Sequence, residues 1–362
     1  MNILIDASTI KSQGGINHLF TVIEVVKSQN ANFFVISNDY LNKKKLFKSN
    51  FIVDNFPSGF FSRVCKFLYY KYFLNKLVKE RNISKFISLS GFIRINNIEN
   101  INFLHNLLPH DMSCLNKLNY KSLIKNIVIR YFQRKTFKNS EKLIYFSYES
   151  MKISQINNKN YRIIPHFIGS NFYYHPKKQN LILPLNKNKI FIAYPSEFFE
   201  YKKHIDLIKI FEKLIYKKFN IQLIFISKSN PGKKIIKLIK KNKKYIQVLK
   251  FKTQKNLIDF YRKKIDLLFF PSECESFGYI TYEALASGIP VISTTKSISL
   301  KILPRYKLFF EPSNLDRSIF KILSYFNNPS LRYENLLYAQ KEIKYKLSKQ
   351  NNFKKMRSYI FE

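Results

Sequence analysis

Residues 265–295 read IDLLFFPSECESFGYITYEALASGIPVISTT, and this stretch decides the fold. An apolar run at 265–270 is short and rich in Leu and Phe, which predicts a buried strand that ends at a proline. After a polar loop, residues 279–287 are expected to form a short helix. Gly288 stands where a left-handed helix cap belongs, and the apolar residues 291–294 begin the next strand. This order of strand, loop, helix and strand is the repeating unit of a parallel α/β sheet.

Two glutamates lie in this unit, Glu275 in the loop and Glu283 on the helix. Both are expected at the carboxyl end of a parallel strand, where open α/β sheets bind ligands. The backbone amides of Ser276, Phe277 and Gly278 lie at the predicted helix N-terminus, which favours bound anions. Carboxylates accept hydrogen bonds well from hydroxyl groups. Acids beside an anion site therefore indicate a ligand that carries neutral hydroxyls, such as those of a sugar.

The segment from Pro271 to Ile292 resembles the E-x7-E signature of the retaining glycosyltransferases of family 4, also called glycosyltransferase group 1. The match runs through ESFGYITYE and ALASGIPVI, with Ser276 where glycine is commoner. The resemblance implies the GT-B fold, an α/β fold of two Rossmann-like parallel-sheet domains that face a cleft. It also implies that Glu275 binds the donor sugar at the catalytic centre and that Glu283 binds the ribose of the nucleotide. The alternative is a helix N-terminus with two solvated acids.

The first half of the chain adds three candidate residues. Gly14 and Gly15 lie in the expected turn between the first strand and a helix that begins near Ile16, and they let the backbone approach a ligand, although a tight turn also explains them. They are similar to the glycine loop of the same family, which contacts the donor phosphates and the acceptor. His105 follows a strand predicted at 102–104. A histidine at such a place is usually structural, but the resemblance implies a catalytic role for His105 near the reacting sugar.

Lys202 precedes a helix predicted at 204–216, after the first strand of the second domain. A lysine at a helix N-terminus opposes the macrodipole, so a bound anion would explain its place. The resemblance implies that Lys202 binds the donor diphosphate. Family members often carry an arginine a few residues earlier, where this chain has Glu197. The second cationic contact is therefore unassigned, with Lys203 or another lysine as its candidate.

Length and composition predict two domains without a covalent or metal framework. We expect an N-terminal Rossmann-like acceptor domain at 1–175, a C-terminal Rossmann-like donor domain at 176–345, and a helix at 346–362 that crosses back to the first domain. The cysteines lack paired or metal-ligand spacing. We find neither a signal peptide nor an apolar run long enough to span a membrane. A cytoplasmic enzyme with no cofactor beyond its nucleotide diphosphate sugar substrate is expected.

The formal charge of +40 usually indicates nucleic acid or an anionic surface as a partner. Lys, Asn, Ile, Phe and Tyr are all abundant while Trp is absent, and this joint bias is what A/T-rich coding would give for part of the excess. The remainder fits a nucleotide-linked donor or anionic lipid. A helix predicted at 62–81 is aromatic and rich in lysine, which indicates either a buried helix with snorkelling lysines or a helix at the inner face of the membrane.

These observations predict a retaining glycosyltransferase that moves a sugar from a nucleotide diphosphate sugar to an acceptor hydroxyl. A glycan or lipid-linked acceptor in cell-surface polysaccharide or glycolipid synthesis is expected, and nucleic acid is not expected as a partner. Two alternatives stay open: another GT-B enzyme, such as an epimerase or phosphorylase, and a basic nucleic-acid-binding protein. The motifs do not specify the base, the sugar or the acceptor.

Overall fold

The computed structural model describes residues 1–10, 13–38, 41, 51–53, 72–174, 189–217, 219–251, 253–295, 300–311 and 314–362. The chain forms two compact units. The first holds Met1–Leu115, Asn119–His166 and Gln350–Glu362, and the second holds Asn116–Leu118 and Phe167–Lys349. The divisions after His166 and Lys349 lie close to the expected ones after residues 175 and 345. Residues 175–188, where the first expected boundary falls, lie outside the described residues.

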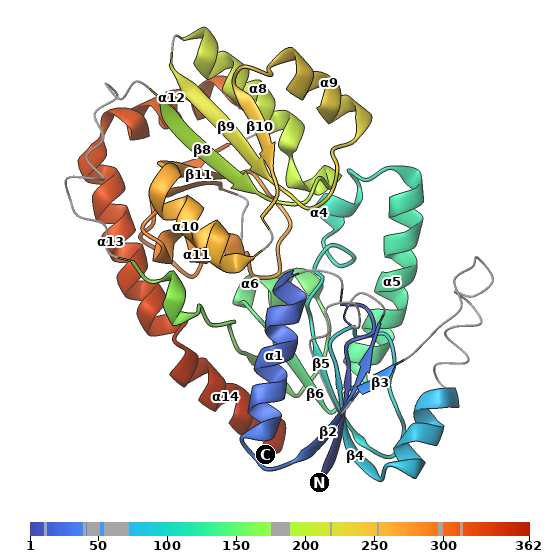
Figure 1. The fold of residues 1–362 in the computed structure, drawn as a ribbon. Helices are drawn as coiled ribbons and strands as arrows, with labels where there is room; N and C mark the ends of the chain where they lie inside the picture. Colours follow the sequence, from blue (N-terminus) through green and yellow to red (C-terminus); the bar gives the residue numbers. More distant parts are fainter. Residues whose placement is uncertain are drawn as a thin grey trace. The chain divides into compact units, whose positions relative to one another are not determined.

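The first unit is built on a seven-stranded sheet in the order β3-β2-β1-β4-β5-β6-β7, in which every neighbouring pair is parallel. Figure 1 shows these strands and their helices. The strands are β1 Asn2–Asp6, β2 Asn32–Ser37, β3 Phe51–Val53, β4 Ile83–Ser88, β5 Glu99–Phe103, β6 Lys142–Tyr145 and β7 Tyr161–Ile163. The helices are α1 Gln13–Lys27, α4 Met112–Leu115, α5 Tyr120–Lys138, α6 Tyr148–Ser154 and α14 Lys349–Phe361, and residues 72–80 are also helical.

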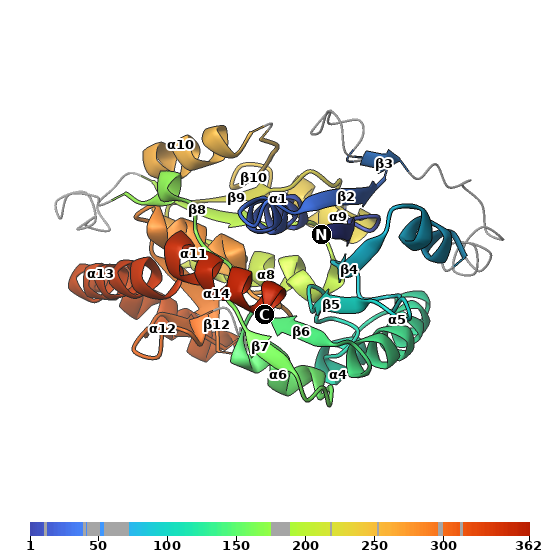
Figure 2. The same ribbon diagram turned by 90° about the horizontal axis from the view of Figure 1, so that it is seen from below.

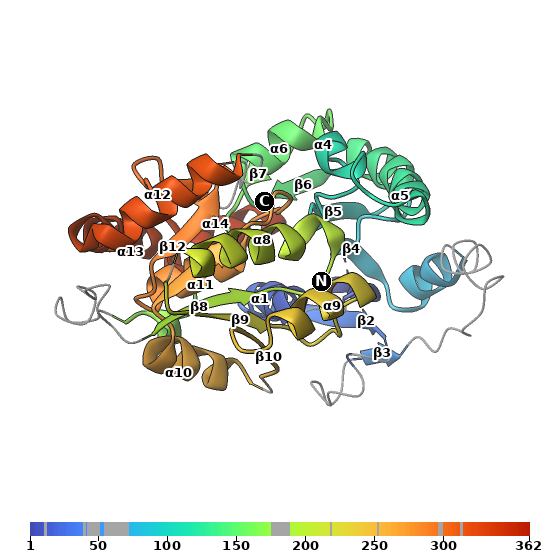
Figure 3. The same ribbon diagram turned by 90° about the horizontal axis from the view of Figure 1, so that it is seen from above.

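The second unit repeats this plan with a six-stranded parallel sheet in the order β10-β9-β8-β11-β12-β13. Its strands are β8 Ile190–Pro195, β9 Ile221–Ile226, β10 Ile246–Leu249, β11 Leu267–Phe270, β12 Val291–Thr294 and β13 Phe309–Phe310. Its helices are α8 His204–Tyr216, α9 Lys233–Lys241, α10 Gln254–Lys264, α11 Tyr279–Ala286, α12 Leu315–Asn327 and α13 Pro329–Lys346, with 3-10 turns η1 Ser170–Phe172 and η2 Glu200–Lys202. Figure 3 shows α8 running along the strands of this sheet. The predicted doubly wound α/β architecture is thereby confirmed.

Strand order reverses once in each sheet, and this reversal fixes where ligands can bind. The first strand of each unit, β1 or β8, has a later strand of its own unit on one side and the next strand in sequence on the other. The connections that leave the two strands beside β1, or beside β8, therefore run over opposite faces of the sheet. This leaves a crevice at the carboxyl ends of the strands. The loops after β1 and β4, and after β8 and β11, are the candidate positions for a site.

The expected position of the two glycines needs correction. Helix α1 begins at Gln13, so Gly14 and Gly15 lie in its first turn rather than in a loop before it. A sequence pattern places the end of a helix only to within a few residues, and the earlier start at Gln13 brings both glycines into the helix. The segment predicted at 62–81 is helical at 72–80, while 54–71 lie outside the described residues. No helix in the described part of the chain is long and apolar enough to cross a bilayer.

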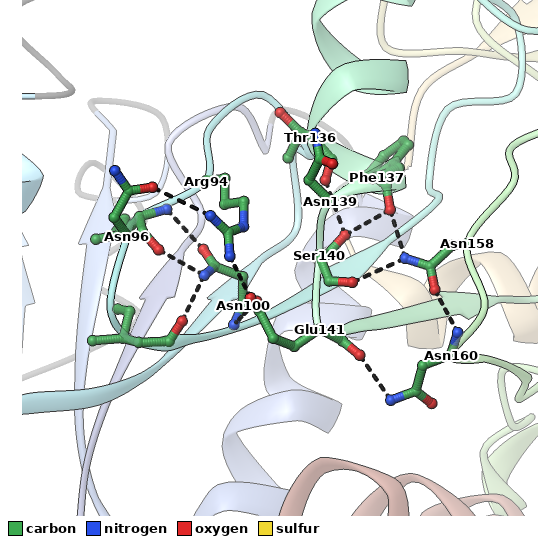
Figure 4. A network of polar contacts seen from close by, with 12 residues as sticks. Arg94, Asn96, Asn100, Thr136, Phe137, Asn139, Ser140, Glu141, Asn158 and Asn160 are labelled. Carbon is green, nitrogen blue, oxygen red and sulfur yellow. Dashed lines mark hydrogen bonds and ion pairs between the residues drawn. The ribbon is translucent and has the colours of Figure 1, made fainter.

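A polar network closes the amino-terminal ends of β5 and β6 (Figure 4). The Asn100 side chain accepts from the backbone N–H of Ile95 and donates to the carbonyls of Ile95 and Ile98, each at 2.8 Å. The Glu141 carboxylate accepts from the backbone N–H of Asn100 at 2.8 Å and pairs with Arg94. Buried backbone groups must be paired, and these side chains supply the partners for the backbone just before β5.

Helix α14 docks on the same edge of the first sheet through a charged cluster. Glu99 lies between Lys85 at 2.5 Å and Lys142 at 2.7 Å, and Lys85 also donates to the carbonyl of Ile360 at 2.8 Å. Lys142 lies over the ring of Tyr359, 5.7 Å from its centroid. Figure 2 shows the C-terminus beside β6. Burial by itself raises the pKa of Glu99, but the hydrogen bonds from Lys142 and Lys85 outweigh it and lower that pKa.

Replacing Glu99 should loosen this docking. Glu99→Gln leaves Lys85 and Lys142, which are 12% and 10% exposed, without their shared anion. We expect the free energy of unfolding of the first unit to fall by about 1–3 kcal/mol at neutral pH. Because the pKa of Glu99 is lowered in the folded state, its contribution is present above the ordinary carboxyl pKa. The difference between variant and wild type should therefore vanish as the pH falls through the folded pKa.

Urea denaturation followed by circular dichroism measures this difference. Glu80→Gln is the matched control, because the Glu80–Lys76 pair is 55% and 62% exposed. The control should change stability by less than about 0.5 kcal/mol. Equal effects of the two substitutions would show that the Glu99 cluster does not hold α14.

Candidate functional site

The clearest candidate site lies at the reversal of strand order in the second unit. Lys202 ends the 3-10 turn η2 after β8, and Glu275 lies in the loop after β11. The Lys202 ammonium forms an ion pair and hydrogen bond with the Glu275 carboxylate. The two side chains are only 14% and 15% exposed. The structure therefore brings together two candidate residues that lie far apart in the sequence of the second unit.

Aromatic side chains fix the position of Lys202. The Tyr194 hydroxyl donates to the backbone carbonyl of Lys202 at 2.7 Å, and the Lys202 ammonium lies 5.1 Å from the centroid of the Tyr201 ring. Burial alone would lower the pKa of Lys202, but the nearby Glu275 carboxylate raises it above its ordinary value. The site thus holds a permanently charged ammonium whose present counterion is a carboxylate.

The loop from Glu275 to Gly278 leads into α11 through a left-handed residue. Gly278 has φ of 82° and precedes the first residue of the helix, and the Thr281 hydroxyl donates to the Gly278 carbonyl at 2.7 Å. A side chain at position 278 would be strained at this φ, which gives the glycine a physical reason. The Phe277 ring packs on Tyr282, with centroids 4.8 Å apart. The backbone amides of Ser276, Phe277 and Gly278 stay predicted contacts to an anion.

Glu283 lies within α11, buried at 8% exposure, and its surroundings are tyrosines. Burial and then the Glu283 charge raise the pKa of both Tyr261 and Tyr279. The Tyr261 hydroxyl is fully buried and has no hydrogen-bond partner among the described residues. Glu275 on the loop and Glu283 on the helix are therefore in different environments, the first paired with an ammonium and the second beside phenols.

Glu197, which stands in place of the expected arginine, serves the loop after β9. Its carboxylate accepts from the Ser227 hydroxyl and the Ser229 backbone N–H at 2.8 Å each, and from the Lys228 N–H at 3.3 Å. Burial by itself raises the pKa of Glu197, but these hydrogen bonds outweigh burial and lower that pKa. Glu197 is therefore an anion held by neutral donors. Lys203 pairs with Asp206 at 3.6 Å. A second cationic contact is therefore still unassigned.

One candidate residue of the first unit, His105, lies in a cluster of three histidines, which we call the histidine cluster: His18, His105 and His166. His105 follows β5, His18 lies in α1 and His166 follows β7. The His105 Nε2 contacts the His18 Nδ1, and ring centroids lie 4.3 Å apart for His18–His105 and 4.9 Å for His18–His166. His166 stacks on Phe146, with centroids 3.7 Å apart.

Burial keeps the histidine cluster uncharged. Burial lowers the pKa of His105 to about 4, and it lowers the pKa of His18 and His166 well below the ordinary value, with mutual repulsion as a further cause. A neutral His105 can accept or donate one hydrogen bond but carries no positive charge at neutral pH. His18 lies one helical turn after Gly14 and Gly15, so α1 links the glycine turn to His105.

Sequence reasoning missed His18, His166, Tyr194 and Tyr201 as parts of these sites. His18 had a signal, because it lies one turn after two glycines that were already candidates. His166 stands in the IPHF segment that ends the first unit. The tyrosines had no such signal, since this chain holds 24 tyrosines. His110, five residues after His105, is buried, and its Nε2 lies 3.1 Å from the Gln133 Oε1, which indicates a structural role.

Comparison with known proteins places this geometry in a class. Residues 177–342 match the family model of glycosyl transferases group 1. A sequence search among curated proteins gave no match. Among solved structures, sucrose-phosphate synthase from Thermosynechococcus elongatus is similar with a TM-score of 0.79 and 12% identity, over 99% of this chain and 98% of that one. WaaG, a glycosyltransferase involved in lipopolysaccharide biosynthesis, gives a TM-score of 0.75 and 14% identity over 99% of each chain.

A third similar structure is HepE from Anabaena in complex with UDP-glucose, with a TM-score of 0.75 and 13% identity over 99% of each chain. At these identities the likeness shows the fold alone, which is GT-B. The family match covers residues 177–342, which lie in the second unit, and it shows a likeness of that part of the chain to glycosyl transferases group 1. Family 4 membership and the roles of individual site residues stay predictions.

Acidification should destabilise the first unit through the histidine cluster. In the unfolded chain each histidine regains a pKa of about 6.5, so between that value and the lowered folded pKa the unfolded state binds more protons. The free energy of unfolding should therefore fall as the pH drops below about 6.5, by about 1.4 kcal/mol per pH unit for each histidine. Urea denaturation between about pH 6.5 and 5 measures this slope.

His166→Phe tests the assignment, because phenylalanine keeps the stacking on Phe146 and removes one titrating group. The slope should become shallower by about 1.4 kcal/mol per pH unit. An unchanged slope would mean that His166 is not held neutral by burial.

Proposed function

We propose that the chain is a retaining glycosyltransferase that moves a sugar from a nucleoside diphosphate sugar to an acceptor hydroxyl. The observation that carries the proposal is the Lys202–Glu275 ion pair at the strand reversal of the group 1 unit. It places one buried cation and one hydrogen-bond-accepting anion beside the amino end of α11. A nucleoside diphosphate sugar is a ligand that offers both a polyanion and a set of hydroxyls.

The ion pair suggests how donor binding would proceed. A diphosphate oxygen can replace the Glu275 carboxylate as the counterion of Lys202, so that the ammonium keeps a partner and pays little for desolvation. Glu275, released from Lys202, can then accept a hydrogen bond from a hydroxyl of the sugar. The sugar would thus be oriented by the same exchange that neutralises the phosphates.

In the transfer step the bond between the anomeric carbon and the diphosphate oxygen breaks, and the acceptor oxygen forms a new bond on the same face. The leaving diphosphate gains negative charge as the sugar becomes cation-like. Lys202 and the N-terminus of α11 stabilise that charge because they are already in place. The acceptor proton leaves with the diphosphate, which balances the reaction without a protein nucleophile.

We assign acceptor binding to the first unit and propose a glycan or lipid-linked acceptor of the cell surface. Gly14 and Gly15 open α1, and His105, held by His18, is a neutral group at the carboxyl end of the first sheet. Such a group can hold an acceptor hydroxyl without opposing its loss of a proton. The likeness to WaaG, a glycosyltransferase involved in lipopolysaccharide biosynthesis, supports this acceptor class. Thermal shift with nucleoside diphosphates and with oligonucleotides separates this function from nucleic-acid binding.

Lys202→Ala should slow transfer strongly. Loss of one preorganised electrostatic group at a leaving group costs about 2–4 kcal/mol, or about thirtyfold to a thousandfold in kcat/KM. The measurement is release of nucleoside diphosphate from UDP-glucose or another donor that supports turnover. Lys213→Ala is the control, because Lys213 lies on the adjacent helix α8 and pairs with the exposed Asp316. Wild-type kinetics in Lys202→Ala would remove Lys202 from the mechanism.

The two glutamates should separate in their effects on ligand binding. Glu283→Gln should weaken both the nucleoside diphosphate and the nucleotide sugar by about 1.5–3 kcal/mol, the range for a hydrogen bond to a charged group. Glu275→Gln should weaken only the nucleotide sugar. It frees Lys202 from its counterion, so the free nucleoside diphosphate should bind as well as before or more tightly.

Isothermal titration calorimetry of both variants with both ligands decides between these assignments. If Glu275→Gln loses the free nucleoside diphosphate as badly as Glu283→Gln does, Glu275 does not face the sugar. Retention is tested separately by NMR, from the anomeric configuration of the first product formed.

A further inference from the structure

Helix α5 exposes an apolar face and buries a polar one. Tyr120, Ile124, Ile127, Val128 and Tyr131 recur at helical spacing on one face, and we call these five residues the α5 ridge. Their exposures are 76%, 45%, 51%, 49% and 65%. Figures 2 and 3 show α5 on the outside of the first unit. This pattern is the reverse of an ordinary surface helix.

The buried face of α5 explains why the ridge cannot turn inward. Asn126 and Gln133 lie on that face, and Asn126 donates to the carbonyl of Ser122 at 2.8 Å. Gln133 donates to the carbonyl of Ser90 at 2.9 Å and contacts His110. Rotating the helix would break the two contacts of Gln133, which reach residues outside α5 and are costly to leave unmade. The fold therefore fixes the α5 ridge at the surface.

Positive charge surrounds the α5 ridge. With 100° per residue, the side chains of Lys121 and Lys125 lie along one side of the ridge and those of Arg130 and Arg134 along the other. Lys135 and Lys138 lie in the last turns. The helix holds no acidic residue. Met112 on α4, 50% exposed, contacts the Arg130 guanidinium and extends the apolar surface.

This combination of side chains selects among possible partners. Ile124, Ile127 and Val128 are aliphatic and offer no stacking surface or hydrogen bond to a nucleic acid. Tyrosines at the two ends of the ridge suit the boundary between headgroups and acyl chains, where one end of the ring is apolar and the other wet. Cations along both sides suit anionic headgroups.

We propose that α5 binds the surface of an anionic lipid bilayer, with the α5 ridge in the boundary between headgroups and acyl chains. The helix lies parallel to the membrane, and its lysines and arginines contact lipid phosphates. This inference goes beyond the proposed function, because it rests on α5 alone and makes no use of the donor site. It concerns a different helix from the sequence-based expectation for residues 62–81, of which residues 62–71 lie outside the described residues.

A tryptophan reporter tests the insertion directly, because the chain has no tryptophan of its own. Val128→Trp places the reporter at the centre of the α5 ridge. Its emission should shift to shorter wavelength with vesicles of equimolar phosphatidylcholine and phosphatidylglycerol, and brominated lipid should quench it. Phe320→Trp on α12, at a position 75% exposed, is the matched control and should show neither change. Absence of a shift in Val128→Trp, in a protein that sediments with the vesicles, overturns the proposal.

Charge variants separate α5 from the general basicity of the protein. Lys121→Gln with Lys125→Gln should lower the partition coefficient onto these vesicles about thirtyfold, the factor that two lysines near a surface give at about 1 kcal/mol each. Lys237→Gln with Lys240→Gln removes the same charge from the exposed lysines of α9 and should change binding much less. Equal losses in the two double variants would contradict a specific role for α5.

Two other results would also overturn the proposal. A doubled mass in light scattering without lipid, with Val128→Trp already shifted, would mean that a second copy of the chain covers the ridge. Protection of the reporter by an oligonucleotide but not by vesicles would mean a nucleic-acid surface. Ile127→Ser with Val128→Ser, checked for wild-type melting, should weaken vesicle binding at least tenfold while donor binding stays unchanged.

Discussion

The ion pair between Lys202 and Glu275 depends on the pairing of β8 with β11. These strands are neighbours, with Leu267 opposite Ile192 and Leu268 opposite Ala193, although β9 and β10 come between them in the sequence. Their carboxyl ends therefore meet at one edge, and each loop contributes one charge. Tyr194 holds the lysine loop through its hydroxyl, and the left-handed Gly278 turns the glutamate loop into α11.

In the first unit, the pairing of parallel strands likewise brings together side chains that are far apart in the sequence. β1 pairs with both β2 and β4, so Asp6 at the end of β1 lies beside Ser88 and Ser90 after β4. The Asp6 carboxylate accepts from the Ser90 hydroxyl at 2.7 Å. Nearby, burial against Phe146 holds the histidine cluster neutral. At the carboxyl ends of its strands, the second unit thus has an ammonium–carboxylate pair, and the first unit has a carboxylate held by a hydroxyl together with uncharged histidines.

Two basic helices, α9 and α5, place their apolar residues in opposite ways. In α9, Ile235, Leu238 and Ile239 are half-buried and the lysines face water, which is the common arrangement of a surface helix. In α5, the uncharged polar residues Asn126 and Gln133 are buried, and the α5 ridge and the lysines face outward. Scarce acids are placed where they act on several cations, as Glu99 does between Lys85 and Lys142. Net charge alone therefore does not indicate which surface binds a partner.

The sequence by itself determined the α/β class and many of its elements. The sequence predicted α8 at 204–216 and β12 at 291–294 with the bounds that the structure has. Gly288 has the predicted left-handed conformation, with φ of 86°. These features follow from local preferences and short-range hydrogen bonds, which a sequence pattern reports directly.

Only the tertiary structure decided which of these residues meet. The pairing of Lys202 with Glu275, the joining of His18 and His166 to His105, and the role of Glu197 in the loop after β9 all depend on strand order. The exposure of the α5 ridge depends on which face of α5 finds buried hydrogen-bond partners. Contacts between residues far apart in the chain are set by the packing of whole elements, and no local pattern of the sequence contains that information.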